Sequence, residues 1–264
     1  MSLNFIQKAS TLPKVVTVTG GASGIGLATA RSLAKLGCAV SLADLDANKL
    51  DAAASTIKTE TPEARILTTA LDIRDRPGVA RWIANTENQL GKISGSFNAA
   101  GVANASHTIK PLIETSDEEW DFAVSVNLTG TMNCVKEQVR AMKASRSEGS
   151  IVVVASIAGL IGLQNGSAYT AAKFGIVGLI RSVAKETGRL GIRLTGIAPG
   201  FVMTPMITDH KFEDGDFMNQ IVAATPLGRG AQPEEVADLA VFLLSGASTY
   251  LNGSIHTIDG GLIA

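Results

Sequence analysis

Tyr169 and Lys173 stand four residues apart in the run SAYTAAK, so a helix would place both side chains on one face. A phenol has an unperturbed pKa of about 10 and is a poor base near neutral pH. A neighbouring ammonium favours the phenolate and lowers that pKa. The pair therefore predicts proton transfer to or from a substrate oxygen, although the spacing alone fits a half-exposed helix pair better.

Ser156 and Asn127 precede this pair in the chain. Ser156 ends an expected strand over 150–156, and ligands of open parallel sheets bind beyond the carboxyl ends of the strands. Asn127 falls inside an expected helix over 117–144, although asparagine is a poor helix former. Taken singly, Ser156 could satisfy a strand-end backbone group and Asn127 a neighbouring loop. Together with Tyr169 and Lys173 they form the candidate catalytic set.

A glycine-rich turn, TGGASGIG (19–26), joins the first expected strand to the first expected helix. Glycines at 20, 24 and 26 would let the backbone turn tightly and approach a pyrophosphate, which then meets free N–H groups at the helix N-terminus. The alternative is a strand-to-helix turn without a ligand. The position of the turn favours a dinucleotide.

Asp44 ends the second expected strand, where an acid can accept hydrogen bonds from the adenosine ribose and repel a 2′-phosphate. Neither Ala22, Ser23 nor Leu45 is an arginine. The sequence therefore predicts NAD(H), with NADP(H) disfavoured. A solvated acid at a strand end is the alternative interpretation.

The elements expected to position these residues alternate along the chain. Apolar strands separated by helices predict an α/β fold, a single-domain doubly wound (Rossmann-type) parallel sheet of about seven strands with helices on both faces, spanning 1–264. Ser116 is expected to cap the helix over 117–144. A segment near 203–230 breaks the rhythm and is expected to be a mobile substrate flap. The strands are expected at 14–19, 38–44, 64–70, 93–99, 150–156, 192–198 and 253–259, and the other helices at 24–37, 46–59, 76–90, 167–188 and 233–245.

In this order the motifs resemble the classical short-chain dehydrogenase/reductase family from about residue 14 to 260. TGGASGIG matches its TGxxxGxG, NAAG (98–101) its NNAG with Ala99 for the second asparagine, and YTAAK its YxxxK. APGFVMT (198–204) matches PGxVxT, with Ala198 where asparagine is frequent. Asp72 lies at the family's adenine contact, and Asn127 and Ser156 match its helix asparagine and its serine.

The resemblance implies oxidation of a secondary alcohol or reduction of a ketone, with Tyr169 as general acid/base. Ser156 would orient the substrate oxygen, Lys173 would also hold the nicotinamide ribose, and Asn127 would hold a water beside Lys173. It also implies a homotetramer, or a dimer, that pairs the helices over 117–144 and 167–188. The cofactor contacts that it implies are Gly20, Ser23, Gly24, Ile25, Gly26, Asp44, Leu45, Asp72, Ile73, Asn98, Ala99, Gly101, Tyr169, Lys173, Pro199, Gly200, Val202 and Thr204.

Composition argues against other classes of protein. The net charge is −1, from 23 basic and 24 acidic residues without a basic stripe, so nucleic-acid binding is not expected. The first residues lack the basic and apolar regions typical of a signal peptide, and the longest apolar run is too short to span a membrane, so no membrane association is expected. Cys38 and Cys134 fit no disulfide framework, which suits a cytoplasmic protein. Neither they nor the three histidines have the spacing of a metal site, so none is expected.

The segments expected to line the substrate pocket, 101–108, 157–165 and 200–222, carry few charges and favour an apolar alcohol or ketone. Two other functions stay open: a non-redox enzyme on the same scaffold (a dehydratase, isomerase or cyclase) and a non-catalytic NAD-binding regulator. The presence of all four candidate catalytic residues favours the oxidoreductase. The apolar side chains expected in the pocket are Val102, Ile157, Ile161, Leu163, Phe201 and Met206.

Overall fold

The computed structural model describes residues 7–8, 11–103, 110–208 and 216–264. Its centre is a parallel sheet of seven strands in the order β3-β2-β1-β4-β5-β6-β7. The predicted doubly wound α/β fold is therefore confirmed. The strands are β1 (Val15–Thr19), β2 (Ala39–Asp44), β3 (Ile66–Ala70), β4 (Gly95–Asn98), β5 (Gly149–Val154), β6 (Ile192–Pro199) and β7 (Ile255–Ile258).

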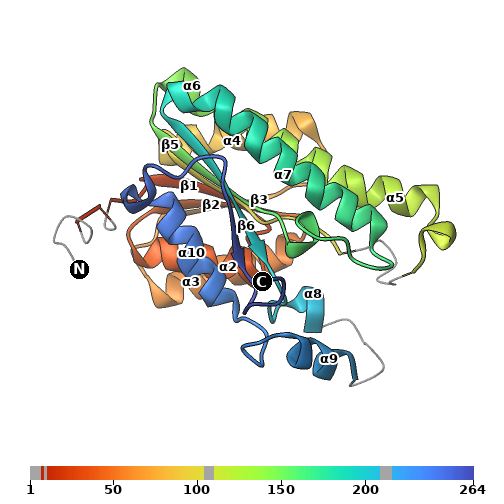
Figure 1. The fold of residues 1–264 in the computed structure, drawn as a ribbon. Helices are drawn as coiled ribbons and strands as arrows, with labels where there is room; N and C mark the ends of the chain where they lie inside the picture. The colour runs from red at the N-terminus through yellow and green to blue at the C-terminus, as the bar shows by residue number, and fades with distance from the viewer. Residues whose placement is uncertain (1–6, 9–10, 104–109, 209–215) are drawn as a thin grey trace.

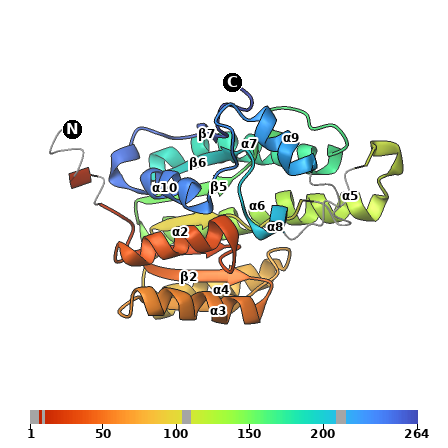
Figure 2. The same cartoon turned by 90° about the horizontal axis from the view of Figure 1, so that it is seen from below.

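Helices cover both faces of this sheet. In Figure 1, α4, α5, α6 and α7 lie above the sheet, and α2, α3 and α10 lie below it. Figure 2 turns the molecule so that α2, α3 and α10 face the viewer. The bounds of these helices are α2 Gly24–Lys35, α3 Ala47–Glu60, α4 Arg76–Leu90, α5 Asp117–Val124, α6 Thr131–Ser145, α7 Ser167–Thr187 and α10 Pro233–Leu244.

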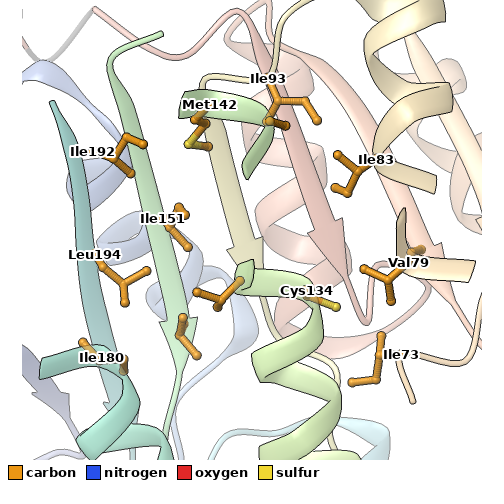
Figure 3. Close-up of a cluster of buried hydrophobic side chains, with 14 of the residues drawn as sticks. Ile73, Val79, Ile83, Ile93, Cys134, Met142, Ile151, Ile180, Ile192 and Leu194 are labelled. Atoms are coloured by element: carbon orange, nitrogen blue, oxygen red, sulfur yellow. The ribbon is translucent and has the colours of Figure 1, made fainter. Parts of the chain in front are cut away.

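Each face of the sheet buries its own hydrophobic core, as expected for strands that are apolar on both sides. Under α4, α6 and α7, Figure 3 shows Cys134, Met142, Ile151 and Leu194 pointing into the space between helices and sheet. The opposite core joins Leu33 of α2, Val236 of α10 and strand residues such as Val152, among others. These two cores fix the strand ends that carry the motifs.

The expected helix over 117–144 has a different internal structure from the one predicted. Its N-terminus is the expected one, because Ser116 and Glu119 form a reciprocal capping box. The helix extends to Ser145, one residue beyond the predicted end, but its middle is a π-helical segment, η2 (Ser125–Gly130), which the prediction did not include and which separates α5 from α6. Asn127 lies within η2. Single π turns inside helices are frequent at functional sites.

The segment after β6 contains two short helices, α8 (Pro205–Thr208) and α9 (Asp216–Ala224). Its start is anchored, because Val202 forms a parallel bridge with Ala231 and the Met203 amide donates to the Ala231 carbonyl at 2.8 Å. Residues 209–215 of the predicted flap lie outside the described residues. Mobility of this segment therefore stays a prediction.

Candidate active site

The sheet order reverses between β1 and β4, and in open α/β sheets ligands bind at such a switch point, beyond the carboxyl ends of the strands. The loops that follow these two strands touch each other here. The Ala100 amide donates to the Thr19 hydroxyl at 3.2 Å. Gly20 has φ +67°, and a Cβ on it would lie 2.9 Å from the Ala100 nitrogen. The glycine turn and the NAAG loop therefore share one site.

The turn after β1 fits a dinucleotide phosphate. Residues 24–26 form the first turn of α2, and Ser23 is its N-cap residue. Within the described chain, the Ser23 side chain makes no capping hydrogen bond, so it leaves the helix amides to other acceptors. Thr204, after β6, reaches this turn, with its Cγ2 3.0 Å from where a Cβ on Gly24 would lie. Uncapped amides at a helix N-terminus suit a phosphate.

Asp44 lies beside the same turn, at the end of β2. Its Oδ2 accepts the Ala22 amide at 3.1 Å, and its Oδ1 accepts the Asp46 amide at 3.4 Å. Asp46 itself caps α3 by accepting the Lys49 amide at 3.0 Å. Leu45, between the two acids, is largely exposed. Asp44 thus lies where the ribose of a dinucleotide is expected, and the neighbouring Asp46 carboxylate is bound to the N-terminus of α3.

Asp72 and Ile73 follow β3 on the same side of the sheet. Arg74 holds Asp72 through its Nη2, 2.6 Å from Oδ2, and the hydrogen-bonded guanidinium lowers the pKa of the Asp72 carboxyl. Ile73 is buried, and its carbonyl accepts Asn133 Nδ2 at 3.0 Å. The Asp72 side chain is thus held by Arg74, and the Ile73 backbone is held by α6.

Asn98 has a partner that the sequence did not reveal. Its carboxamide pairs reciprocally with that of Gln138 on α6, with N–O distances of 2.9 and 3.0 Å, and both residues are buried. The Asn98 side chain therefore joins the sheet to α6. The Asn98 backbone is the part of this residue left to contact a cofactor. In the sequence, Gln138 could have been noticed as a polar residue on the apolar face of an amphipathic helix.

Tyr169 and Lys173 share one face of α7, as their spacing predicts, and Ser156 faces them from the end of β5. The Ser156 hydroxyl lies close enough to Tyr169 to favour its phenolate, and it accepts the Ala158 amide at 3.1 Å. Lys173 Nζ lies over the Tyr169 ring, 5.5 Å from its centroid. Three of the four candidate catalytic groups are thus in contact.

Lys173 is a buried cation. Its Nζ donates to the Val154 carbonyl at 3.1 Å, and only 6% of the residue is exposed. None of the ion pairs found in the described residues includes it. Burial therefore lowers the pKa of Lys173 to about 8.

The predicted lowering of the Tyr169 pKa by Lys173 is wrong for the protein alone. Desolvation raises the pKa of the Tyr169 phenol, and the hydrogen bond with Ser156 opposes this only in part. The ammonium lies over the ring and bonds to a backbone carbonyl, and desolvation dominates. Tyr169 is accordingly a protonated phenol at neutral pH.

Asn127 reaches the loop after β4 from the π-helical segment. Its Nδ2 donates to the carbonyls of Val102 and Ala123, at 2.9 and 3.0 Å, and its Oδ1 accepts the Val102 amide at 3.1 Å. A Cβ on Gly101 would lie 2.7 Å from this Oδ1 and 3.8 Å from Lys173 Nζ, so a glycine is required there. Asn127 therefore clamps the loop beside Lys173, and its role in holding a water stays a prediction.

The remaining predicted cofactor contacts follow β6. Gly200 donates its amide to the Ile258 carbonyl of β7 at 3.0 Å, and Pro199 lies in register with Ile258. Val202 is held by its bridge to Ala231. All the predicted cofactor residues therefore belong to the carboxyl ends of the strands, or to helices and loops that adjoin them.

The apolar side chains expected to line the substrate pocket differ in exposure. Ile161, Leu163 and Met206 are exposed, and Ile157 is buried in the 3-10 turn η3 (Ile157–Gly159). The Lys110 amide, just beyond the expected segment 101–108, donates to the Asn165 carbonyl at the end of the segment 157–165, at 3.2 Å. Residues 104–108 of this expected pocket lie outside the described residues.

Two kinds of feature are absent from the described residues. The described residues contain no group of three histidine, cysteine or acidic side chains that could hold a metal. In the same part of the chain, no helix has the length and apolar character to cross a membrane. Cys38 and Cys134 are both buried free thiols.

Comparisons with known proteins agree with this geometry. Residues 20–263 match the family model described as "Enoyl-(Acyl carrier protein) reductase". The short-chain dehydrogenase/reductase aba4 of Botryotinia fuckeliana (strain B05.10) is 43% identical over 251 residues, 94% of this chain and 96% of that protein. The cis-4-hydroxycyclohexanecarboxylate dehydrogenase of Sinomonas cyclohexanicum is 37% identical over 251 residues, 95% of this chain and 97% of that protein.

The solved structures include a similar fold. The crystal structure of levodione reductase superposes with a TM-score of 0.90 at 36% identity, covering 94% of this chain and 96% of that one. The matches span nearly the whole chain, and the fold and the ordered motifs agree with them. The chain belongs to the classical short-chain dehydrogenase/reductase family.

Proposed function

We propose that this protein is an NAD(H)-dependent oxidoreductase that interconverts a secondary alcohol and a ketone on a mostly apolar small molecule. The observation that carries the proposal is the contact of Ser156, Tyr169 and Lys173 at the carboxyl end of β5. The name of one relative, a dehydrogenase of cis-4-hydroxycyclohexanecarboxylate, supports a secondary alcohol as substrate. It also makes six-membered carbocycles the first compounds to test.

In the direction of ketone reduction, Tyr169 donates its proton to the substrate oxygen. Its raised pKa keeps the phenol protonated in the free protein, which suits a general acid. The Ser156 hydroxyl, held by the Ala158 amide, orients the same substrate oxygen. A bound nicotinamide supplies the hydride, or accepts it in the reverse direction.

In the direction of alcohol oxidation, Tyr169 must accept the proton. With a pKa of about 8, Lys173 is mostly protonated at neutral pH, and its charge favours the phenolate. The positive charge of an oxidised nicotinamide would also favour the phenolate. Tyr169 is thus expected to change between acid and base with the redox state of the cofactor.

The proposed cofactor contacts follow the geometry of the strand ends. Residues 20 and 23–26 would hold the pyrophosphate, Asp44 the adenosine ribose and Asp72 the adenine. The nicotinamide end would be held by Tyr169, Lys173 and residues 199–204. The carboxylates of Asp44 and Asp46 support NAD(H), because a 2′-phosphate would be repelled by both.

The cofactor preference can be measured directly. We expect kcat/KM for NADH to exceed that for NADPH at least about tenfold, corresponding to about 1.4 kcal/mol, because Asp44 meets the ribose end. Absorbance at the NADH band, with cyclohexanones and acyclic ketones as substrates, gives both values. A clear preference for NADPH would contradict the assignment of Asp44, and NADH binding without turnover of any compound would favour a regulator instead.

We also propose that the protein is a cytoplasmic homotetramer, or a dimer. Phe174 on α7 is 46% exposed, and a Cβ on Gly178 would meet no described atom within 4 Å. This small, apolar face of α7 would accept a partner helix. The two buried free thiols suit a reducing compartment.

A further inference from the structure

Arg74, which none of the recognised motifs includes, makes an extended contact with Asp72. Its backbone amide donates to Oδ1 at 2.9 Å, its Nε lies 3.0 Å from both carboxylate oxygens, and its Nη2 lies 2.6 Å from Oδ2. Planar forks of this kind fix the orientation of a carboxylate as well as its position. Asp72 is therefore held in one orientation by its neighbour.

The same guanidinium lies over an aromatic ring of another element. Its Cζ is 5.4 Å from the centroid of Phe122 on α5, within the range of a cation–π contact. The stack joins the end of β3 to the helix that leads into η2 and Asn127. Arg74 thus contacts both the expected adenine site and the helix of a candidate catalytic residue.

A second contact ties this segment to the same helices. Ile73 packs against Gly130, where a Cβ would lie 2.6 Å from the Ile73 Cγ1, and Asn133 Nδ2 bonds to the Ile73 carbonyl. The backbone at residue 73 is therefore already fixed. What remains free to rotate in this segment is the Asp72 side chain, and Arg74 is the residue that restrains it.

We propose that Arg74 is a positioning residue for the adenine end of the cofactor, which orients the Asp72 carboxylate and ties it to α5 through Phe122. A carboxylate offers about four acceptor sites. Arg74 brings three N–H donors to Asp72, namely its backbone amide, its Nε shared between both oxygens, and its Nη2, so one acceptor site is left for an N–H of a purine. The inference rests on the proposed function only in requiring that a nicotinamide dinucleotide binds.

The contact differs from an ordinary surface ion pair. Exposed pairs contribute little, because two long side chains must be held in one geometry. Here the aromatic ring and the Asp72 backbone turn already restrict the guanidinium. The Arg31–Glu60 pair, which joins α2 to the last residue of α3, is a similar fork that does not involve Asp72. It provides a matched control.

The test measures binding of NADH by its fluorescence and of ADP-ribose by displacement. We expect Arg74→Ala to raise both dissociation constants about tenfold, equivalent to about 1.4 kcal/mol. Because only the adenine end is affected, KM for NADH should rise while kcat at saturating NADH stays near wild type. Arg74→Lys, which keeps the charge without the fork, and Phe122→Leu, which removes the stack, should give intermediate values.

The control Arg31→Ala should bind both ligands as the wild type does. Unchanged binding in Arg74→Ala, or a fall in kcat without a change in affinity, would overturn the inference. If the dissociation constants shift as expected but no alcohol or ketone is turned over, the proposed activity fails while the role of Arg74 stands. If the wild type binds neither NADH nor ADP-ribose, both are wrong.

Discussion

Burial of Lys173 in the candidate site lowers the stability of the fold. Its ammonium is buried against the Val154 carbonyl, and the pKa falls from 10.5 to about 8. Between these pH values the unfolded chain binds more protons than the folded one, so this group makes the protein more stable as pH rises through the window. Below about pH 8 both states are protonated and the full cost of burial remains.

Lys173→Met should remove this cost together with activity. Relative to wild type, the free energy of unfolding should gain about 3 kcal/mol at pH 7 and about 1 kcal/mol at pH 9.5, less the lost hydrogen bond at both values. Urea unfolding at the two pH values measures the difference. Lys185→Met, on the exposed side of the same helix, is the control, and an equal effect at both pH values would contradict the account.

For single residues, the sequence predicted which side chains lie together better than it predicted their pKa values. The four-residue spacing correctly placed Tyr169 and Lys173 on one face. The direction of the Tyr169 pKa could not be predicted, because it depends on how much water the surrounding chain excludes. The Asn98–Gln138 pair was also missed, since a polar residue on the buried face of a helix does not reveal which distant strand residue it bonds to.

Among the elements, the long helix before β5 shows where the spacing of apolar residues is not enough to predict the structure. Its start was predictable from Ser116 and Glu119, which form the capping box. The π-helical segment was not, because one wide turn hardly changes the pattern of apolar residues. Asn127 was the available clue, as a poor helix former inside an expected helix. Its side chain bonds to the Val102 backbone instead of facing solvent.

The strands were predicted to within two residues at each end, because the central strands are buried on both faces and are rich in apolar residues. The structure of the segment after β6 was harder to predict. Its polar, glycine- and proline-containing sequence has no period, and the expectation of a flap over the site did not include α8 and α9. Anchoring at Ala231 depends on a contact between segments distant in sequence.

For the whole molecule, the alternation of apolar strands and helices was sufficient to predict the fold. A doubly wound sheet has one switch point, and the glycine turn and the NAAG loop had to meet there. The assembly cannot be predicted in the same way, because an exposed helix face in one chain does not determine its partner.

The proposed assembly makes its own prediction. Phe174→Asp would place a charge in the interface proposed along α7 and should shift the protein from a tetramer or dimer to a smaller species. Light scattering after size-exclusion chromatography measures the mass. Ser55→Asp, on the exposed face of α3, should leave the mass unchanged. A wild-type protein that is monomeric would contradict the assembly.

The central claim is that Tyr169 transfers the proton, and Tyr169→Phe tests it most directly. The variant keeps the ring beside Lys173 and removes only the hydroxyl. We expect turnover of a ketone that the wild type reduces to fall by about 10²–10⁴-fold, the contribution typical of a general acid, while the dissociation constant for NADH stays near wild type. Wild-type turnover by Tyr169→Phe would contradict the account.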